Sequence, residues 1–510
     1  MANPIERIKQ EKDGLAVRDE LAHFARIGWE TIDKGDLERL KWVGWFFRKK
    51  TPGRWMLRLR LPGGFVTSEQ MYQLADILKV FSDIQRADIT TRQNLELRGV
   101  RIEDSVEIMS RLHQMGLTSI QSGMDNVRNV VGSPIAGLDP EELIDVRDLT
   151  YRIQDMLTSG GVGNPEFSNL PRKFNISITG DRENSAHAEI NDIGFVPALK
   201  YTEDGRERIG FNVLVGGLFS AQRAEAALPL DAFVEPDGVV ELCRAILIVY
   251  RDHGPRDSRG RSRLMYLIDD WGIARFRTEV EQLHGHLEPA SEHECIDYEK
   301  RDHVGIHRQK QPGHSFVGLH VTLGKLGPEE MIELGRLAEV YGSGEVRLTV
   351  EQSVIIPDIA DHKLDAFLAE PLLKVFSPDP PKLLRGLVSC TGLQFCNLAI
   401  IETKNRALAV VEQLEAELEV PRPIRMHWSG CPNSCGQSYI GDIGLLGCKT
   451  KVDGKTVDAV DILVGGRIGK DARLAELFME AVPCEELHGV LKTLLVERFG
   501  AVERLVGAVR

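Results

Sequence analysis

The sequence predicts an α+β protein built from two similar halves, and three observations support this prediction. The chain has 510 residues, which is too long for one ordinary hydrophobic core. Hydrophobic residues make up 42% and charged residues 27%, an ordinary globular composition. The chain also repeats itself in the order A-B-A′-B′. Such a duplication predicts a pseudo-two-fold molecule whose halves share an interface, and ligand clefts often form at interfaces of this kind.

The first repeated unit, A, spans residues 51–93 and recurs at residues 311–352. Both copies begin with a Pro-Gly pair, and apolar residues then match at a constant offset. Each copy predicts a strand, an amphipathic helix and a second strand. The predicted ranges are 55–61, 68–81 and 88–97 in the first copy, and 317–323, 328–341 and 345–356 in the second.

The second repeated unit, B, follows each copy of A. The segment Asp192-Ile-Gly194 recurs as Asp442-Ile-Gly444, and Leu214-Val-Gly-Gly217 recurs as Leu463-Val-Gly-Gly466. We therefore expect five parts: an N-terminal extension that wraps the surface, then A, B, A′ and B′, at residues 1–45, 46–130, 131–300, 301–376 and 377–510.

The charge balance excludes some classes of protein. The formal net charge is −13, from 63 basic and 76 acidic residues, whereas nucleic-acid binders are usually basic. No apolar stretch approaches the roughly 18 residues that a membrane span needs. Residues 1–13 mix both charge signs and carry no apolar signal region. We therefore expect no nucleic-acid or membrane partner and a cytoplasmic location, where disulfides are disfavoured.

Four of the eight cysteines are grouped. Cys390 and Cys396 form a C-x5-C pair, and Cys431 and Cys435 form a C-x3-C pair. Structural zinc prefers two to four residues between paired cysteines, which only the second pair satisfies. Iron–sulfur clusters accept more varied spacings, so the pattern favours a cluster over zinc. The cysteines expected to be small core residues are Cys243, Cys295 and Cys484.

Basic residues precede the cysteine region in a chain that is acidic overall. Arg58 and Arg60 alternate along one predicted strand and so share a face, Arg92 is expected on another strand, and Lys173 and Asn175 are expected to share a strand face. Arg128 belongs to the same group. Each cation taken singly is an ordinary solvated side chain, but fixed cations together suit an anion or a polycarboxylate.

The four-cysteine pattern, with Gly430-Cys-Pro-Asn-Ser-Cys435, resembles the sirohaem- and [4Fe–4S]-containing assimilatory nitrite and sulfite reductases. The A-B-A′-B′ order is similar too, and the resemblance covers the chain from about Trp45 onward. The blocks that carry it are 90–94, 170–175, 211–220, 350–352 and 390–404. The segment 390–396, followed by Ile400-Ile-Glu-Thr-Lys404, resembles the ferredoxin–nitrite reductase branch.

The resemblance implies that A and A′ are ferredoxin-like half-domains and that B and B′ are mixed α/β domains that bind sirohaem and the cluster. It also implies residue roles. The implied cluster ligands are Cys390, Cys396, Cys431 and Cys435, the last also bound to sirohaem iron. The implied catalytic shell around the anion is Arg58, Arg128, Lys173 and Asn175. The implied sirohaem contacts are Arg92, Arg263, Gln352 and Asn433, with Gln93 and Arg223 placed by proximity to these blocks.

The implied activity is the six-electron reduction of nitrite to ammonia by a monomer. No Gly-rich dinucleotide fingerprint is found, which favours a separate carrier, ferredoxin or flavodoxin, as electron donor. The basic run from Arg251 to Arg263 is a candidate docking surface, although a solvated loop explains it equally well. Two alternatives stay open. One is an assimilatory sulfite reductase, which typically carries Lys where this chain has Asn175; the other is a non-catalytic zinc- or cluster-stabilised scaffold.

Overall fold

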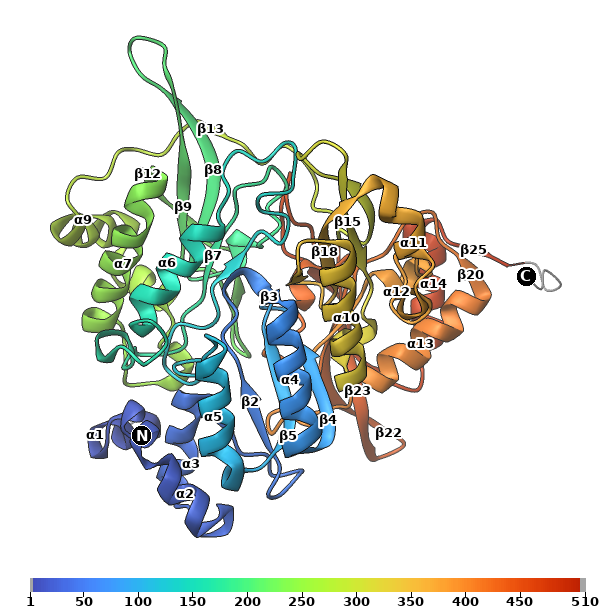
Figure 1. Cartoon of the computed structure of the whole chain (residues 1–510), viewed down its shortest axis with the longest axis horizontal. Helices are drawn as coiled ribbons and strands as arrows, with labels where there is room; N and C mark the ends of the chain where they lie inside the picture. The colour runs from blue at the N-terminus through green and yellow to red at the C-terminus, as the bar shows by residue number, and fades with distance from the viewer. Residues whose placement is uncertain (1–2, 505–510) are drawn as a thin grey trace.

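The computed structural model describes residues 3–504 and contains four main sheets (Figure 1). Two of these sheets are five-stranded and belong to the A units. The first has the order β1 (Trp45–Phe46), β2 (Trp55–Arg58), β5 (Leu95–Val100), β4 (Ser82–Ile89) and β16 (Lys325–Leu326). The second has the order β14 (Gly305–Arg308), β15 (His314–Leu319), β18 (Val354–Ala360), β17 (Glu345–Leu348) and β3 (Phe65–Thr67).

The two A units exchange strands. Strand β16 comes from the second half but pairs with β4 of the first, where Leu326 lies opposite Ala87. Strand β3 comes from the first half but pairs with β17 of the second, where Val66 lies opposite Val346. Each sheet is therefore completed by a strand of the other half, and this exchange forms part of the predicted interface between the halves.

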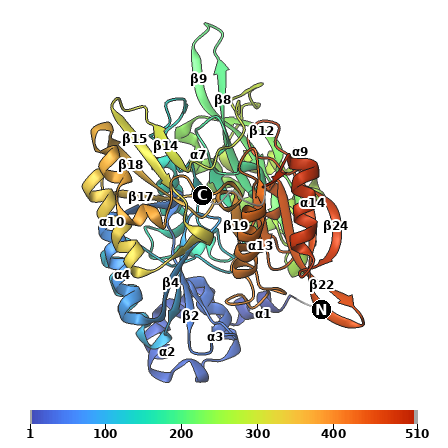
Figure 2. The same cartoon turned by 90° about the vertical axis from the view of Figure 1, so that its right-hand side faces the viewer.

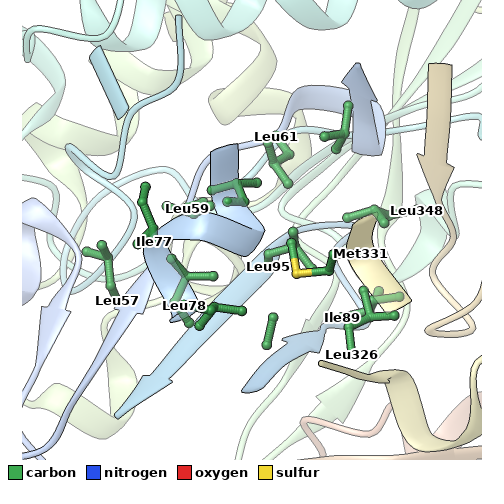
Figure 3. Packing of buried hydrophobic residues seen from close by; sticks show 14 of the residues in the cluster. Leu57, Leu59, Leu61, Ile77, Leu78, Ile89, Leu95, Leu326, Met331 and Leu348 are labelled. Atoms are coloured by element: carbon green, nitrogen blue, oxygen red, sulfur yellow. The ribbon is translucent and has the colours of Figure 1, made fainter. Parts of the chain in front are cut away.

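Helices α4 (Ser68–Phe81) and α10 (Pro328–Tyr341) have the bounds that the sequence predicts. A capping box between Thr67 and Gln70 starts α4, and a proline in the first turn starts α10. The two helices lie side by side (Figures 1 and 2). Their buried faces join the strands in one core; Figure 3 shows residues of both halves in it, among them Leu78, Met331 and Leu348. This shared core fixes the half-domains relative to each other.

The B unit is a mixed sheet with helices packed on it. Its order is β12 (Leu228–Val234), β9 (Glu207–Val215), β8 (Ile193–Tyr201), β7 (Ile176–Ile178) and β6 (Val131–Gly132), and β13 (His293–Glu294) also pairs with β8. Its helices are α6 (Arg147–Thr158), α7 (Val239–His253), α8 (Leu264–Trp271) and α9 (Ile273–His284). Strands β6, β7 and β8 are parallel, whereas β8, β9 and β12 are antiparallel.

The B′ unit repeats this topology. Its order is β19 (Leu387–Ser389), β21 (Met426–Ser429), β22 (Ile443–Val452), β23 (Lys455–Val464) and β24 (Glu476–Pro483), again with three parallel strands followed by antiparallel ones. Its helices are α12 (Lys382–Arg385), α13 (Lys404–Glu417) and α14 (Leu487–Phe499). The register repeats as well, because Gly194 lies opposite Leu214 and Gly444 opposite Leu463. The long hairpins β8–β9 and β22–β23 both project from the body (Figure 2).

The N-terminal segment forms α1 (Pro4–Glu11), α2 (Leu21–Ile27) and α3 (Lys34–Arg39) at one end of the molecule (Figure 1). It does not only cover a surface. Trp42 is fully buried, and its indole N–H donates to the carbonyl of Ser168 at 2.7 Å. Lys9 reaches Asp125 and the carbonyl of Leu170 at 3.3 and 3.0 Å.

Two predicted strands are hairpins instead. The ranges 88–97 and 345–356 each contain a tight turn, at residues 90–94 and 349–353, between two antiparallel strands. In each turn the positive φ angle falls on a glutamine, Gln93 at 55° and Gln352 at 64°. Neither turn has a glycine at that position, so the sequence lacks the usual hairpin signal. Among the helices of the described residues, none has the length and apolar character that a bilayer crossing requires.

Candidate functional site

The two hairpin turns bring the first predicted site residues together. Arg92 lies in the turn between β4 and β5, not on a strand as the sequence suggests. The amide side chain of Gln93 exchanges two hydrogen bonds with the backbone of Gly132, at 2.9 and 3.0 Å. The amide of Gln352 donates to the carbonyl of Ile89 at 2.9 Å and accepts from the N–H of Ser389 at 2.9 Å. Both glutamines therefore anchor the turns to the B and B′ sheets.

Six basic side chains form what we call the cationic cluster: Arg58, Arg92, Arg128, Arg172, Lys173 and Arg263. Their proximity is visible in their electrostatics. Burial and the like charges of Arg58, Arg92 and Arg172 lower the pKa of Arg128 well below its usual range. Burial and the charges of Arg263, Arg92 and Arg172 do the same to the pKa of Lys173, while the thiolate of Cys435 opposes this effect. The cluster therefore lies beside Cys435.

Four members of the cationic cluster have no carboxylate partner within salt-bridge distance among residues 3–504: Arg92, Arg128, Arg172 and Lys173. The Nε of Arg128 is buried and lacks a hydrogen-bond partner in that range. These four side chains are half-buried, and removing unpaired cations from water is costly, so this arrangement suits an anion that completes the site.

Arg58 and Arg263 are held in place by buried acids. Arg58, at the end of β2, donates to Glu96 at 2.9 and 2.7 Å and lies over the ring of Phe46 at 4.5 Å. Arg263 donates to Asp192 at 3.0 and 2.6 Å. Burial alone would raise the pKa of Glu96, but the charges of Arg98, Arg58 and Arg48 lower it to about 2. Both guanidinium groups are thus oriented before any ligand arrives.

Asn175 and Lys173 precede strand β7 instead of sharing a face of it. The N–H of Asn175 donates to Asp192 at 2.8 Å, so the carboxylate that holds Arg263 also positions Asn175. The Oδ1 atom of Asn175 is buried and has no hydrogen-bond partner in the described range. This oxygen and the Nε of Arg128 are two buried polar atoms at the site that await a partner.

In the loop after β21, burial raises the pKa of the Cys431 thiol, while two donors from Asn433 favour its thiolate form. The backbone N–H of Asn433 points to the Cys431 sulfur, and the Asn433 side-chain amide donates to that sulfur at 3.4 Å. The hydroxyl of Thr91 donates to the carbonyl of Cys435 at 3.0 Å, which links this loop to the turn that carries Arg92. Thiolates, the form that binds iron, are stabilised by such donors.

The duplicate loop in the first half supports this interpretation. At an offset of 250 residues, Cys431 corresponds to Asp181 and Cys435 to Ser185, with the same sequence of turns. The N–H groups of Glu183 and Ser185 donate to Asp181 Oδ1 at 3.1 and 3.2 Å. The loop of the first half thus holds a carboxylate where the loop of the second half holds a sulfur, and only the second copy of this loop carries cysteines.

The other cysteine pair lies in the loop after β19. The N–H of Gly430 donates to the Cys390 sulfur at 3.2 Å, and the N–H of Leu398 donates to the Cys396 sulfur at 3.4 Å. Burial and the neighbouring charges of Cys435 and Cys396 raise the pKa of Cys390 to about 12. The charges of Cys435 and Cys396 likewise act on Cys431. The four thiols are therefore neighbours, and each is a free cysteine.

This donor set fits an iron–sulfur cube better than a single ion. Within the described part of the chain, no group of three or more His, Cys, Asp or Glu side chains is close enough to hold one metal ion. Four free thiols whose charges act on one another agree with a multi-iron cluster held between them.

Buried ion pairs fasten the cysteine loop to the first half-domain. Lys404 donates to Asp88 at 2.9 Å and to the carbonyl of Leu323 at 2.7 Å. Arg98 donates to Asp88 at 2.7 Å and to the hydroxyl of Thr391, next to Cys390, at 2.8 Å. Burial opposes ionisation of Asp88, but these cations lower its pKa far below its usual range. The loop is therefore held rigidly at the interface of the halves.

Several basic residues have other roles. Arg223 lies between β10 (Leu218–Phe219) and β11 (Ala224–Glu225) and is ion-paired with both Glu225 and Asp269. In the basic run 251–263, Arg256 pairs with Glu6 and Arg259 with Asp125. Arg60 is buried and donates to backbone carbonyls, including those of Val127 and Arg128 at 2.7 and 3.1 Å.

Sequence reasoning missed two cations. The charge of Arg172 lowers the pKa of both Arg128 and Lys173. Arg172 directly precedes Lys173 in the sequence, but only the lysine was predicted to belong to the site. The Nε of Arg48 is buried and has no partner in the described range. Burial and the charge of Arg98 lower the pKa of Arg48, whereas the charge of Cys396 opposes this effect. Because both depend on contacts between distant segments, strand alternation could not reveal them.

Comparison with known families explains this arrangement. A model described as "Nitrite and sulphite reductase 4Fe-4S domain" matches residues 123–287 and 382–496. A second, described as "Nitrite/Sulfite reductase ferredoxin-like half domain", matches residues 47–115 and 307–373. Together they cover most of the chain. The chain belongs to the nitrite and sulphite reductase family. The α+β prediction with ferredoxin-like half-domains is confirmed.

Individual relatives agree with the family. The chain is 57% identical over 504 residues to a ferredoxin–nitrite reductase of Synechococcus elongatus, with 98% of each chain covered. It is 49% identical to a chloroplastic ferredoxin–nitrite reductase of Spinacia oleracea, over 98% of this chain and 86% of that one. The solved structure of the Mycobacterium tuberculosis NirA protein matches with a TM-score of 0.89 and 30% identity, covering 100% of this chain and 95% of that one.

Proposed function

We propose that this protein catalyses the six-electron reduction of nitrite to ammonia, with electrons from reduced ferredoxin. The observation that carries the proposal is the cationic cluster beside Cys435, in which Arg92, Arg128 and Lys173 lack carboxylate partners in the described range. Family members that are 46–57% identical over nearly the whole chain are named ferredoxin–nitrite reductases, which supports the same substrate and donor.

The cofactors are a [4Fe–4S] cluster and sirohaem. In this proposal Cys390, Cys396, Cys431 and Cys435 hold the cluster, and Cys435 also meets the haem iron. Arg92, Arg263 and the Asn433 side chain would contact the periphery of the haem. Sirohaem carries eight carboxylates, so its binding would neutralise a half-buried cationic cluster. When bound, the two cofactors supply an iron centre that takes electrons singly from an external carrier.

Gln93 and Gln352 act through the turns that they anchor. Each amide group donates to one backbone carbonyl and accepts from one backbone N–H, so the two side chains fix the position of Arg92 and of the strand that leads to Cys390. Arg223 is the weakest of the proposed haem contacts, because two carboxylates already hold its guanidinium group.

The proposed anion-binding residues have different contacts, and we infer a different role for each from those contacts. Arg58 is oriented by Glu96, and so presents a fixed guanidinium edge. Arg128 has a free buried Nε and clamps the anion. Lys173, whose pKa is lowered by burial and by Arg263, Arg92 and Arg172, can give up a proton more readily than an ordinary lysine. It is therefore our candidate for the proton donor as N–O bonds break.

Asn175 favours nitrite over sulfite. It contributes no charge, whereas a lysine there would add a cation for a doubly charged oxyanion. The second candidate function, assimilatory sulfite reduction to sulfide, uses the same cofactors and is less favoured for this reason.

The rest of the proposal concerns partners, place and organisation. The donor is ferredoxin, or flavodoxin as a substitute, and the enzyme works as a monomer in the cytoplasm, where reducing conditions keep thiols free. The division into residues 1–45, 46–130, 131–300, 301–376 and 377–510 agrees with the strand exchange and the repeated sheets.

Steady-state kinetics with chemically reduced viologen test the function. The proposal predicts a higher kcat/KM for nitrite than for sulfite, with ammonia as the product. A higher kcat/KM for sulfite would overturn it in favour of the second candidate. Colourless protein that contains zinc and no iron would overturn both.

A further inference from the structure

A pocket lined by charged side chains lies outside the cationic cluster and takes most of its wall from the second half of the chain. It has a volume of about 350 Å³, which is within the range of small-molecule sites. Its wall carries Lys300, Arg301, Arg385, Arg422 and Arg425 together with the acids Glu299, Asp302 and Glu351. An apolar side is formed by Val388, Ile440 and Ile468.

This pocket is the counterpart of the cationic cluster under the pseudo-two-fold relation. The N–H of Asn175 donates to Asp192 at 2.8 Å, and the N–H of Arg425 donates to Asp442 at 2.8 Å, so these residues occupy equivalent positions. In the two hairpin turns, Arg92 is replaced by Glu351. The first site is cationic, whereas the second presents both signs of charge.

The arginines of the pocket keep free donors. Arg385 uses its Nε and Nη2 on Asp302, both at 2.7 Å, and Arg425 uses its Nε and Nη2 on Asp442 at 3.2 and 3.5 Å. Within residues 3–504 the Nη1 atoms of Arg385 and Arg425 have no hydrogen-bond partner. Their carboxylate partners thus orient the guanidinium groups and leave one donor on each for an incoming carboxylate.

Glu351 contributes a negative charge to the same pocket. Its Oε1 accepts from Lys300 and lies 3.7 Å from His187 Nε2, whereas its Oε2 is buried and has no partner among the described residues. Burial opposes its ionisation, but the charge of Lys300 and the neighbouring imidazole of His187 keep its pKa far below the usual range. An ionised oxygen without a partner requires a donor, preferably a cationic one.

We propose that this pocket binds a small zwitterion of the α-amino acid type. Its carboxylate would meet the free donors of Arg385 and Arg425, its ammonium group would meet the Glu351 carboxylate, and its side chain would lie against Val388, Ile440 and Ile468. A simple anion or a simple cation would satisfy only one half of this wall.

The site also has a route to the cluster loop. His187 Nδ1 lies 3.0 Å from Gln437 Oε1, Gln437 Nε2 donates to the carbonyl of Thr91 at 3.1 Å, and Thr91 donates to the carbonyl of Cys435. Because Glu351 lies 3.7 Å from His187 Nε2, a ligand on Glu351 would lie next to the hydrogen-bond chain that leads from His187 to the carbonyl of Cys435. We expect ligand binding to perturb the optical spectrum of the holoenzyme.

Isothermal titration calorimetry on the holoenzyme tests the proposal. The probes are L-leucine and L-glutamine, with acetate and methylammonium as the two half-ligands. We expect at least one amino acid to bind with one site per chain, and at least tenfold more tightly than either half-ligand, a difference of about 1.4 kcal/mol. No saturable binding of either amino acid, or equal binding of a half-ligand, would overturn the proposal.

Variants locate the binding. Arg425→Gln and Glu351→Gln should each weaken the amino acid at least tenfold, whereas the matched control Lys451→Gln, on the exposed β22–β23 hairpin, should leave it unchanged. If Arg425→Gln fails to fold by its melting curve, Arg385→Gln takes its place. Equal affinity in the folded pocket variants and wild type would refute the site. Nitrite turnover, measured in parallel, reports on the proposed function independently.

Discussion

Replacing Asp192 by Asn tests how the cationic cluster is held, and the duplication provides a matched control. Asp192 is fully buried and accepts two hydrogen bonds from Arg263, whose side chain is 4% exposed, and one from the N–H of Asn175. The variant leaves a buried guanidinium group without its counter-charge. Breaking such a pair costs about 3–5 kcal/mol.

The control is Asp442→Asn in the second half. Asp442 has the same backbone contact, to Arg425, and also pairs with Arg422. Those side chains are 20% and 51% exposed, so water can solvate them once the carboxylate is gone. We therefore expect a smaller loss of about 1–2 kcal/mol.

Two assays distinguish the variants. Parallel urea titrations should give the larger destabilisation for Asp192→Asn, and steady-state kinetics should give a raised KM for nitrite in that variant only, because Arg263 and Asn175 lose their common support. An equal or larger destabilisation in Asp442→Asn, together with an unchanged KM in Asp192→Asn, would refute the reasoning.

Three further predictions address separate parts of the account. Because the pKa of Glu96 is lowered to about 2, its contribution to the free energy of unfolding is present above pH 4.5 and is lost as the pH falls towards 2. In Glu96→Gln, the free energy of unfolding should lack roughly 3 kcal/mol of this pH dependence. The control Glu412→Gln, at an exposed position, should retain it. Cys435→Ser should remove or uncouple both cofactors in the optical and EPR spectra, and wild-type spectra would show that the bridging assignment is wrong. Asn175→Lys should shift the ratio of kcat/KM values towards sulfite, and an unchanged ratio would count against the charge argument.

Much of the fold could be predicted because the relevant signals are local. Helices α4 and α10 have periodic apolar faces and clear start signals, so their bounds match the prediction. The turns at 90–94 and 349–353 could not be predicted, because glutamines take the positive φ angles and an extended polar–apolar pattern continues through them. The misplacement of Arg92 on a strand follows from this.

The candidate site divides in the same way. The cysteine spacing is written in the sequence and indicated the cluster directly. Ion pairing cannot be predicted from the sequence in this way, because partners such as Arg263 and Asp192, or Arg223 and Asp269, come from separate segments. Only the fold shows that Arg172 joins the cationic cluster while Arg223 is already neutralised.

The central claim is that unpaired cations and four cysteines form one nitrite-reducing centre. The most direct measurement is the stoichiometry of reduced ferredoxin oxidised per nitrite by purified protein whose sirohaem and iron content are known. The account predicts six electrons per nitrite, ammonia as the product, and four cluster irons plus one haem iron per chain. A protein without sirohaem, or one that oxidises ferredoxin with sulfite but not with nitrite, would contradict it.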